Sequence, residues 1–237
     1  MSLSSAEPLR LVLAASSWRL HTPAGVHDLS FDGDPVPALL ALEQTAPPRR
    51  GARLSIELGD AWLRYMIVRW PPGLRSARER QLWVAARFRT VHGIAADDWS
   101  IVVDRQHWGE AAFACAVPRT LVDALGEWAR RHRLRVDACG GAFLQAYNRA
   151  ASRCASDHGA FALCRDGRLT VVSWAHGQWR RVRSEPSGAQ PAHILARTLT
   201  LWSADAPAGE PGSIFLEGLQ PAVLPPGWSA SVVGVAA

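Results

Sequence analysis

The chain has 237 residues, of which 48% are hydrophobic and 20% charged, a balance that is typical of a folded globular protein and excludes a disordered one. A chain of this length forms one large or two small domains. Its net charge of +5 comes from arginine alone, because the sequence contains no lysine. We attribute this bias to GC-rich coding, so the charge does not by itself indicate nucleic-acid binding.

The N-terminal region shows no targeting or membrane-spanning segment. The longest apolar runs, such as residues 9–16, are far shorter than the roughly 20 residues that a membrane-spanning helix needs. Residues 1–11 also lack the basic start, the long apolar middle and the small-residue cleavage site of a secretory signal. We therefore expect a cytoplasmic protein.

The first part of the chain reads as a set of strands followed by a helix. Short apolar runs indicate the strands, and a Pro-Ala-Gly stretch at residues 23–25 indicates a turn between two of them. We expect a three-stranded meander and then a short apolar helix. The three strands and the helix are expected at residues 9–15, 17–21, 26–31 and 37–44.

A tight hairpin is predicted around Gly59 and Asp60. Residues 54–58 alternate between apolar and polar, Gly-Asp is a two-residue turn signal, and residues 62–70 read as the return strand. A helix and a further strand follow. The helix, which Ser76 can cap, is expected to end near Val91, and the strand is expected at residues 99–104.

The central segment, residues 111–148, has the pattern strand, helix, strand, helix. Residues 111–117 are apolar throughout, as in a strand covered on both faces, and the helix after Pro118 has its apolar residues at helical spacing. The apolar helix residues are Leu121, Leu125, Trp128 and Ala129. Residues 134–138 alternate, which indicates a half-buried strand, and residues 143–154 are again helical. We expect the two strands to be parallel neighbours joined by a right-handed crossover.

The last third repeats the order of the first: a meander, a helix and further strands. Its turns are expected at Arg165-Asp166-Gly167 and His176-Gly177-Gln178. The strands are expected at residues 160–164, 169–175, 179–183, 213–216 and 231–235, and the helix at residues 194–202. The repeated order predicts an α/β fold of two related halves. The predicted halves are residues 1–155 and residues 156–237.

The sequence contains no catalytic or metal-binding motif of the G-x-S-x-G, P-loop, G-x-G-x-x-G or H-E-x-x-H type. Neighbouring carboxylates such as Asp97 and Asp98 point apart, and His132 or His158 beside an Asp is more often structural than catalytic. We therefore expect no catalytic residue and no metal site. The cysteines form no C-x-x-C pair and are expected to be small buried hydrophobic side chains. They are Cys115, Cys139, Cys154 and Cys164.

Two arginine clusters leave three explanations open. The first contains Arg130, Arg131, Arg133 and Arg135, and the second contains Arg180, Arg181 and Arg183 beside Trp174 and Trp179. The arginines can complement a helix dipole and form a solvated face. They can bind an acidic protein or an anionic membrane surface. Basic groups interleaved with aromatic rings can also hold a nucleic acid.

Three segments resemble the actin-like proteins PilM, of type IV pilus assembly, and the cytoplasmic domain of GspL, of type II secretion. Residues 52–90 resemble a segment of the family in which two strands are followed by an aliphatic residue and a proline, and then by a helix. Residues 113–149 resemble its strand, helix, Leu-x-Val-Asp strand and second helix, and residues 161–185 resemble the meander that opens its second half. The resemblance implies an actin-like (ribonuclease H-like) fold with mixed sheets flanked by helices.

The resemblance also locates two loops that cradle phosphates in nucleotide-binding members, where glycine N–H groups approach the phosphates and an aspartate holds Mg²⁺. Here the first loop reads Leu-Ala-Ala-Ser-Ser and the second reads Leu-Cys-Arg-Asp-Gly-Arg. The remaining phosphate-binding candidates are Ser16, Ser17, Asp166 and Gly167. The chain is also short for the subdomain that covers the adenine. We therefore expect a pseudo-ATPase with no cofactor.

The family likeness implies a non-enzymatic cytoplasmic scaffold or adaptor, peripheral at the inner membrane and able to form a homodimer. Such a protein would bind the cytoplasmic segment of a membrane partner, by strand addition or groove docking, and link it to the assembly ATPase. Three alternatives stay open: a nucleotide-binding actin-like ATPase of the same system, an arginine-rich nucleic-acid-binding module, and an interaction module that reuses the fold elsewhere.

Overall fold

The computed structural model describes residues 9–104, 110–154, 156–204, 212–220 and 223–233. These residues form two compact units. The first comprises the residues up to Leu63, Asp97–Ser100 and Val117–Ala142, and the second comprises Arg64–Ala96, Ile101–Ala116 and the residues from Phe143 onward. Residues 1–8, which belong to the stretch expected to lack a secretory signal, lie outside the described residues. The division into halves at residues 155 and 156 stays a prediction.

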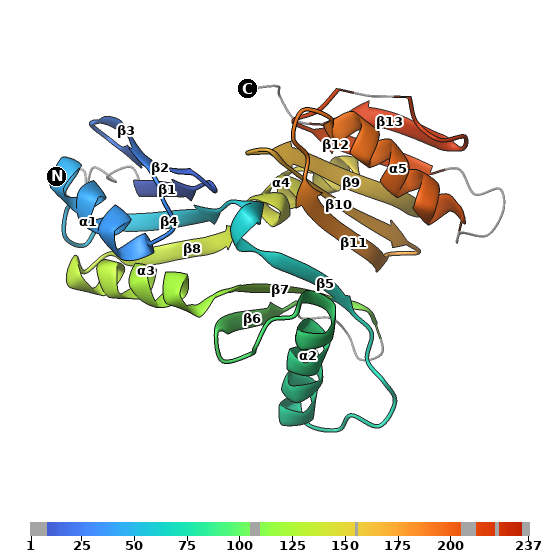
Figure 1. Ribbon diagram of the computed structural model, residues 1–237, viewed down its shortest axis with the longest axis horizontal. Helices are drawn as coiled ribbons and strands as arrows, with labels where there is room; N and C mark the ends of the chain where they lie inside the picture. The colour runs from blue at the N-terminus through green and yellow to red at the C-terminus, as the bar shows by residue number, and fades with distance from the viewer. Residues whose placement is uncertain (1–8, 105–109, 155, 205–211, 221–222, 234–237) are drawn as a thin grey trace, which may run out of the picture. The chain divides into compact units, whose positions relative to one another are not determined.

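The first unit is built on a five-stranded mixed sheet in the order β3-β2-β1-β4-β8 (Figure 1). Its strands are β1 (Leu9–Leu13), β2 (Ser17–Thr22), β3 (Gly25–Ser30), β4 (Arg53–Leu58) and β8 (Arg135–Gly141). The first three strands form an antiparallel meander in which β2 lies between β1 and β3, whereas β4 and β8 run parallel to β1. The predicted meander is therefore confirmed.

Helices α1 (Pro35–Thr45) and α3 (Arg119–Arg131) pack against each other in this unit. Asp34 caps α1 by accepting a hydrogen bond from the backbone N–H of Val36, and Pro35 occupies a first-turn position where its missing N–H costs nothing. The predicted apolar face of α3 is buried, with Leu121 and Trp128 almost fully covered. The helix prediction for this segment is confirmed.

The second unit repeats the same sheet topology, in the order β11-β10-β9-β12-β13. Its strands are β9 (His158–Arg165), β10 (Arg168–Ala175), β11 (Gln178–Pro186), β12 (Gly212–Glu217) and β13 (Trp228–Val232). Again three strands form an antiparallel meander and two run parallel to its first strand. Residues 234 and 235 of the predicted last strand lie outside the described residues.

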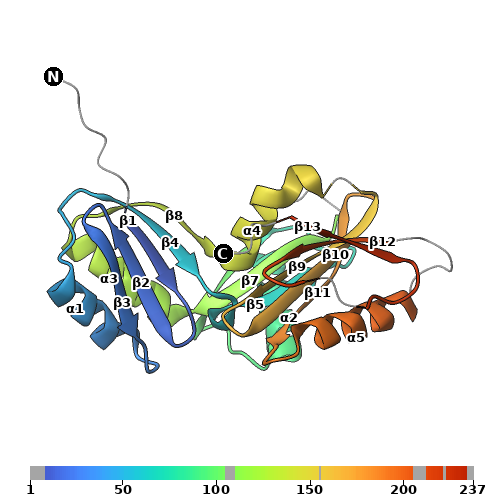
Figure 2. The same ribbon diagram turned by 90° about the horizontal axis from the view of Figure 1, so that it is seen from above.

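Helices cover both faces of this second sheet, with α5 (Pro191–Ala204) on one side and α4 (Ala142–Ala150) on the other (Figure 2). Leu195 and Leu199 of α5 pack in a buried cluster with aliphatic strand residues. On the opposite face, Phe143 of α4 meets Phe161 of β9 edge to face, with ring centroids 5.6 Å apart. The sheet is therefore buried between two helices, as its apolar meander strands predict.

A third sheet, in the order β5-β7-β6, consists of β5 (Arg64–Val68), β6 (Trp99–Val103) and β7 (Ala112–Pro118). Helix α2 (Ala77–His92) contacts β5 and buries Val84 and Phe88. The predicted cap is confirmed: the Ser76 hydroxyl accepts from the N–H of Glu79, and the Glu79 carboxylate accepts from the N–H of Ser76.

The predicted hairpin at Gly59-Asp60 is wrong. A two-residue hairpin turn of this type needs a positive φ, but Gly59 has a φ of −60° and is followed by a short 3-10 helix, Asp60–Trp62. Trp62 packs edge-on against Phe31, at 5.0 Å, and donates a hydrogen bond to the Ala14 carbonyl. The contacts of this partly buried indole hold the segment as a connection between two sheets, and β5 pairs with β7 instead of β4.

The predicted parallel pairing of residues 111–117 with residues 134–138 is also wrong. The first strand, β7, pairs antiparallel with β5, whereas the second, β8, joins the first sheet beside β4. A helical connection defines a crossover only when both strands share one sheet. The β8 residues from Arg135 to Cys139 are exposed, so this strand is not half buried.

The prediction that all four cysteines are buried is only partly right. Cys154 is buried, Cys115 and Cys164 are partly buried, and Cys139 is exposed on β8. Cys139 is exposed because it lies on an edge strand that pairs with β4 alone among the described strands.

Candidate functional site

The described residues of the second unit contain a small hollow lined largely by aromatic side chains, which we call the aromatic pocket. It lies where α4 ends beside the β10–β11 hairpin, and its volume is about 190 Å³. Its lining residues are Tyr147, Cys154, Ser156, Trp174, Gly177 and Trp179.

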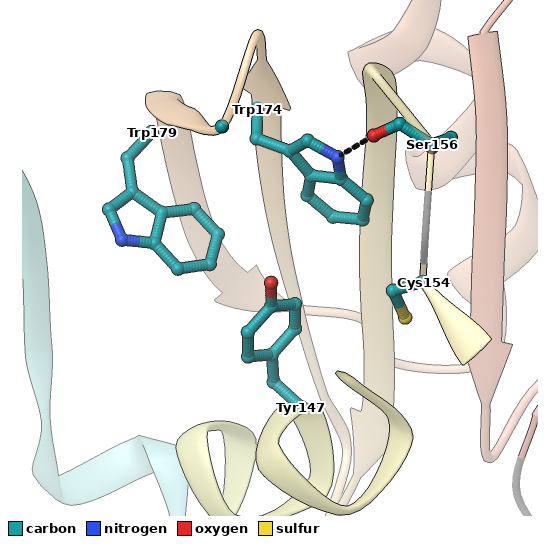
Figure 3. A pocket seen from close by; sticks show the side chains of 6 residues that line it. Tyr147, Cys154, Ser156, Trp174 and Trp179 are labelled. Carbon is teal, nitrogen blue, oxygen red and sulfur yellow. Dashed lines mark hydrogen bonds between the residues drawn. The ribbon is translucent and has the colours of Figure 1, made fainter. Parts of the chain in front are cut away.

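Three rings of the aromatic pocket meet edge to face (Figure 3): the two indoles are inclined by 87° to each other, and the Tyr147 ring is inclined by 64° to each of them. The Tyr147 ring is 5.0 Å from Trp179 and 5.9 Å from Trp174, centroid to centroid, and the two indoles are 6.3 Å apart. Edge-to-face contacts of this kind place the positive edge of one ring on the negative face of the next. The rings therefore hold one another in position.

Trp174 forms a fixed wall of the aromatic pocket. Its indole N–H donates a 2.8 Å hydrogen bond to the Ser156 carbonyl, and its ring stacks on Phe215. Gly159 leaves room for the indole, because a Cβ at this position would lie only 2.5 Å from Cζ2 of Trp174. The sequence places a glycine where this ring crosses the backbone of β9.

The turn between β10 and β11 brings Trp179 opposite Trp174. His176 and Gly177 have φ angles of 52° and 71°, which are the left-handed values of a two-residue hairpin turn and favour glycine at the second position. The strands on either side then pair Trp174 with Trp179 across the ladder. The turn predicted at His176-Gly177-Gln178 is confirmed at His176 and Gly177, and it brings two lining residues of the aromatic pocket, Trp174 and Trp179, opposite each other.

The Tyr147 hydroxyl is a hydrogen-bond donor in the aromatic pocket, whereas the indole nitrogen of Trp179 lies on the side of its ring away from Tyr147 and Trp174 (Figure 3). In Figure 3 the Tyr147 hydroxyl points toward the space between the two indoles. Burial raises the pKa of Tyr147, to which nearby Cys154 also contributes, and burial raises the pKa of the Cys154 thiol to about 11. The lining is therefore uncharged at neutral pH and combines apolar ring faces with neutral donors.

The phosphate-binding candidates lie on two tight turns, one in each unit. Ser16 and Ser17 are exposed at the β1–β2 turn, which is closed by a hydrogen bond from the Ala14 N–H to the Ser17 carbonyl. Asp166 and Gly167 are exposed between β9 and β10, with φ angles of 51° and 70°. Each is a two-residue hairpin turn rather than an extended glycine-rich loop. Their role in phosphate binding stays a prediction.

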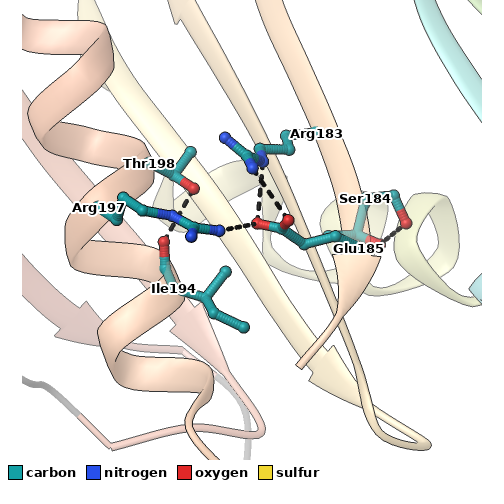
Figure 4. Close-up of polar contacts among 7 residues, drawn as sticks. Arg183, Ser184, Glu185, Ile194, Arg197 and Thr198 are labelled. Atoms are coloured by element: carbon teal, nitrogen blue, oxygen red, sulfur yellow. Dashed lines mark hydrogen bonds and ion pairs between the residues drawn. The ribbon is translucent and has the colours of Figure 1, made fainter. Parts of the chain in front are cut away.

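One arginine of the second cluster, Arg183, is paired with a carboxylate. Glu185 accepts from Arg183 at 2.9 Å and from Arg197 of α5 at 3.5 Å (Figure 4). In the first cluster, Arg130 pairs with Glu127, and Arg131 lies 3.4 Å from Glu43. These pairs favour the interpretation of the arginines as a solvated, internally compensated surface.

The structure shows the neighbours of the two histidines named in the sequence analysis. His132 lies 3.1 Å from the Glu43 carboxylate, and His158 packs on the His176 ring. Within the part of the chain that the structure describes, no three His, Cys, Asp or Glu side chains gather as a metal site. No helix of that part is both long and apolar enough to span a membrane.

Comparison with known proteins shows the fold. No family model and no curated relative matches the chain. Among solved structures, a Bacteroides thetaiotaomicron protein with an actin-like ATPase fold and unknown function aligns over 92% of this chain and 84% of its own, with a TM-score of 0.57 and 13% identity.

Two further structures are of the two kinds of protein named in the sequence analysis, the cytoplasmic domain of a GspL-type protein and PilM. The cytoplasmic domain of EpsL, an inner-membrane component of the Vibrio cholerae type II secretion system, aligns over 96% of this chain and 90% of its own, with a TM-score of 0.54 and 16% identity. A chain of the PilM–PilN type IV pilus biogenesis complex aligns over 90% and 82%, with a TM-score of 0.53 and 14% identity. The chain therefore has the actin-like fold, and the predicted fold class is confirmed.

Proposed function

We propose that the chain is a non-enzymatic adaptor in the inner-membrane assembly platform of a type II secretion system or a type IV pilus. The observation that carries the proposal is the duplicated sheet topology, which aligns with the EpsL cytoplasmic domain over nearly the whole of both chains. In this role the protein is cytoplasmic and associates with the inner membrane through a partner.

The two hairpin turns support a role that does not involve nucleotide hydrolysis. A phosphate-binding loop needs several backbone N–H groups directed at the ligand and an aspartate near the metal ion. At the first turn the Ala14 N–H is instead used within the hairpin, and Ser16 and Ser17 supply no carboxylate. At the second turn Asp166 and Gly167 occupy the two corner positions. The proposal therefore assigns no catalytic residue and no cofactor.

The partner in this proposal is the cytoplasmic segment of an inner-membrane assembly protein, and the adaptor links that segment to the assembly ATPase. The PilM–PilN complex supports a protein partner, because it is a complex between an actin-like chain of this fold and a second pilus protein. We further propose that the adaptor binds no nucleic acid, since carboxylates pair with Arg130 and Arg131 of the first cluster and with Arg183 of the second.

Co-purification tests this function. The full chain, carrying an affinity tag, is co-expressed with the cytoplasmic segments of the secretion or pilus inner-membrane proteins of the same organism, and separately with the assembly ATPase. We expect one membrane-protein segment to co-elute at a fixed ratio and to survive gel filtration. Failure of every segment to co-elute would contradict the adaptor role. We also propose that the chain can form a homodimer, and a measurement of its molecular mass in solution without a partner tests this.

A further inference from the structure

Strand β5, helix α2 and the loop between them carry the positive charge of the chain (Figure 1). Residues 64–92 contain seven arginines and one acidic residue, Glu79, whereas the other residues contain 19 arginines and 20 acidic residues. We infer that the outer face of α2 binds directly to an anionic lipid surface, with its arginines on the headgroup phosphates and Leu82 inserted between the headgroups. This inference goes beyond the proposed function, in which a protein partner supplies the association with the membrane.

Five of these seven arginines are exposed, and their guanidinium groups have no carboxylate partner among the residues that the structure describes. The five are Arg69, Arg75, Arg78, Arg87 and Arg89. The Glu79 carboxylate instead accepts from the backbone N–H groups of Arg75 and Ser76, at 2.8 and 2.9 Å, and so closes the cap of α2. Arg87 lies over the Trp83 ring, 5.9 Å from its centroid. The positive charge is therefore available to an anion outside the chain.

An exposed leucine lies between two of these arginines on the outer face of α2. Arg78, Leu82 and Arg89 are four and seven residues apart, a spacing that brings side chains to the same face of a helix. Val84 and Phe88 are buried on the inner face, whereas Leu82 is 62% exposed. The outer face therefore combines an apolar side chain with a guanidinium group on either side of it.

This combination distinguishes a lipid surface from other anionic partners. A bilayer offers phosphates to the guanidinium groups and an apolar layer beneath them, so it accepts Leu82 together with the arginines beside it. Nucleic acid offers the phosphates, but a leucine in the middle of the row would face charged groups instead of an apolar layer. Peptides typically dock in a groove or along a strand edge, whereas the outer side of a helix is convex.

The full chain is mixed with phosphatidylcholine vesicles that contain phosphatidylglycerol, and the bound fraction is measured by sedimentation. Vesicles of phosphatidylcholine alone, duplex DNA and polyglutamate are the parallel probes. We expect the chain to bind the vesicles that contain phosphatidylglycerol more tightly than any of the other three. The binding should weaken at high salt, because salt screens the attraction between exposed charges.

Matched variants separate the position of the charges from their number. Arg78→Gln combined with Arg89→Gln should weaken vesicle binding by roughly 25-fold, about fivefold for each arginine near an anionic surface. Arg130→Gln combined with Arg131→Gln removes the same charge from α3, where carboxylates pair with both side chains. This control should weaken binding by no more than about twofold. Far-UV circular dichroism reports whether each variant is folded.

Leu82→Ala tests the insertion of the apolar side chain, because it keeps the charge and a residue that favours a helix. Binding to the vesicles that contain phosphatidylglycerol should weaken by roughly three- to tenfold, since less apolar surface enters the headgroup layer. Unchanged vesicle binding by Leu82→Ala would overturn the assignment of a lipid surface.

Three further outcomes would overturn the inference: no binding to the vesicles that contain phosphatidylglycerol, equal binding to phosphatidylcholine alone, or tighter binding to DNA or polyglutamate. An equal loss of vesicle binding in the α2 and α3 double variants would also overturn it. Vesicle binding together with failed partner co-purification would leave the lipid surface standing and remove the proposed adaptor role. Partner capture without vesicle binding would do the reverse.

Discussion

Gly159 lies directly beneath the indole of Trp174, and a Cβ at Gly159 would come within 2.5 Å of Cζ2 and 2.8 Å of Cε2 of that ring. The indole has little freedom to move away, because its N–H is bonded to the Ser156 carbonyl and its face stacks on Phe215. The aromatic pocket therefore depends on a glycine that does not line it.

Gly159→Ala should destabilise the protein by about 1–3 kcal/mol, the usual cost of forcing an extra carbon into a packed core. Urea unfolding followed by far-UV circular dichroism measures this cost. Gly126→Ala, in the interior of α3 where no atom lies within 4 Å of the new Cβ, is the control and should gain about 0.5–1 kcal/mol. Equal stability of Gly159→Ala and the parent chain would show that the Trp174 indole is not fixed.

The capping box at the start of α2 predicts a loss of stability in Ser76→Ala of about 0.5–2 kcal/mol. The substitution leaves the N–H of Glu79 without the hydroxyl that lies 3.1 Å away. Ser76→Thr retains the acceptor and should restore most of the loss. Thermal unfolding of the three proteins provides the test, and an Ser76→Ala variant as stable as Ser76→Thr would contradict the assignment.

His92 makes the stability of the protein depend on pH. Burial lowers the pKa of His92, and the Tyr65 carbonyl, 3.0 Å from Nε2, accepts a hydrogen bond from the neutral ring. The pKa of His92 in the folded chain lies below its value of about 6.5 in the unfolded chain. Between these two pKa values the unfolded chain binds more protons than the folded chain. The free energy of unfolding therefore decreases as the pH falls below about 6.5.

The pH effect can be isolated by comparing the parent chain with His92→Gln, which keeps a side-chain donor but does not titrate. The urea midpoint of the parent should fall more steeply between pH 7.5 and pH 5.5 than that of the variant. Parallel profiles would mean that His92 titrates alike in the folded and unfolded chains.

The shared carboxylate of Glu185 predicts how the arginine surface responds to a mutation. Glu185→Gln removes the partner of Arg183 and Arg197, so these two guanidinium groups become uncompensated. We expect the parent chain to show no salt-sensitive binding of single-stranded or duplex DNA by fluorescence anisotropy, and the variant to gain weak binding that is lost on adding salt. Salt-sensitive binding by the parent would instead favour the nucleic-acid alternative.

Local patterns predicted the elements well where a short stretch determines its own geometry. The turns at Asp166-Gly167 and His176-Gly177 need positive φ angles, and the residues that supply them are adjacent in the chain. The same holds for the capping box at Ser76, whose two partners are three residues apart. Duplication of the order of elements was enough to predict two related sheets.

Sheet membership could not be predicted from local patterns. Gly59-Asp60 has the composition of a hairpin turn. However, Trp62 packs against Phe31, and the strand that follows, β5, belongs to a different sheet from β4. The aromatic pocket was missed for a similar reason. Its residues come from α4, the segment after it and the β10–β11 hairpin, and the sequence marked Trp174 and Trp179 only as neighbours of arginines.

We propose that this actin-like chain acts by binding a protein partner and not by hydrolysing nucleotide. Calorimetric titration of the purified chain with Mg-ATP and Mg-ADP distinguishes the two roles. We expect no heat of binding at millimolar nucleotide, for the parent chain and for Asp166→Ala alike. Micromolar binding, with hydrolysis that Asp166→Ala abolishes, would rule out the proposed role and identify the β9–β10 turn as a working phosphate loop.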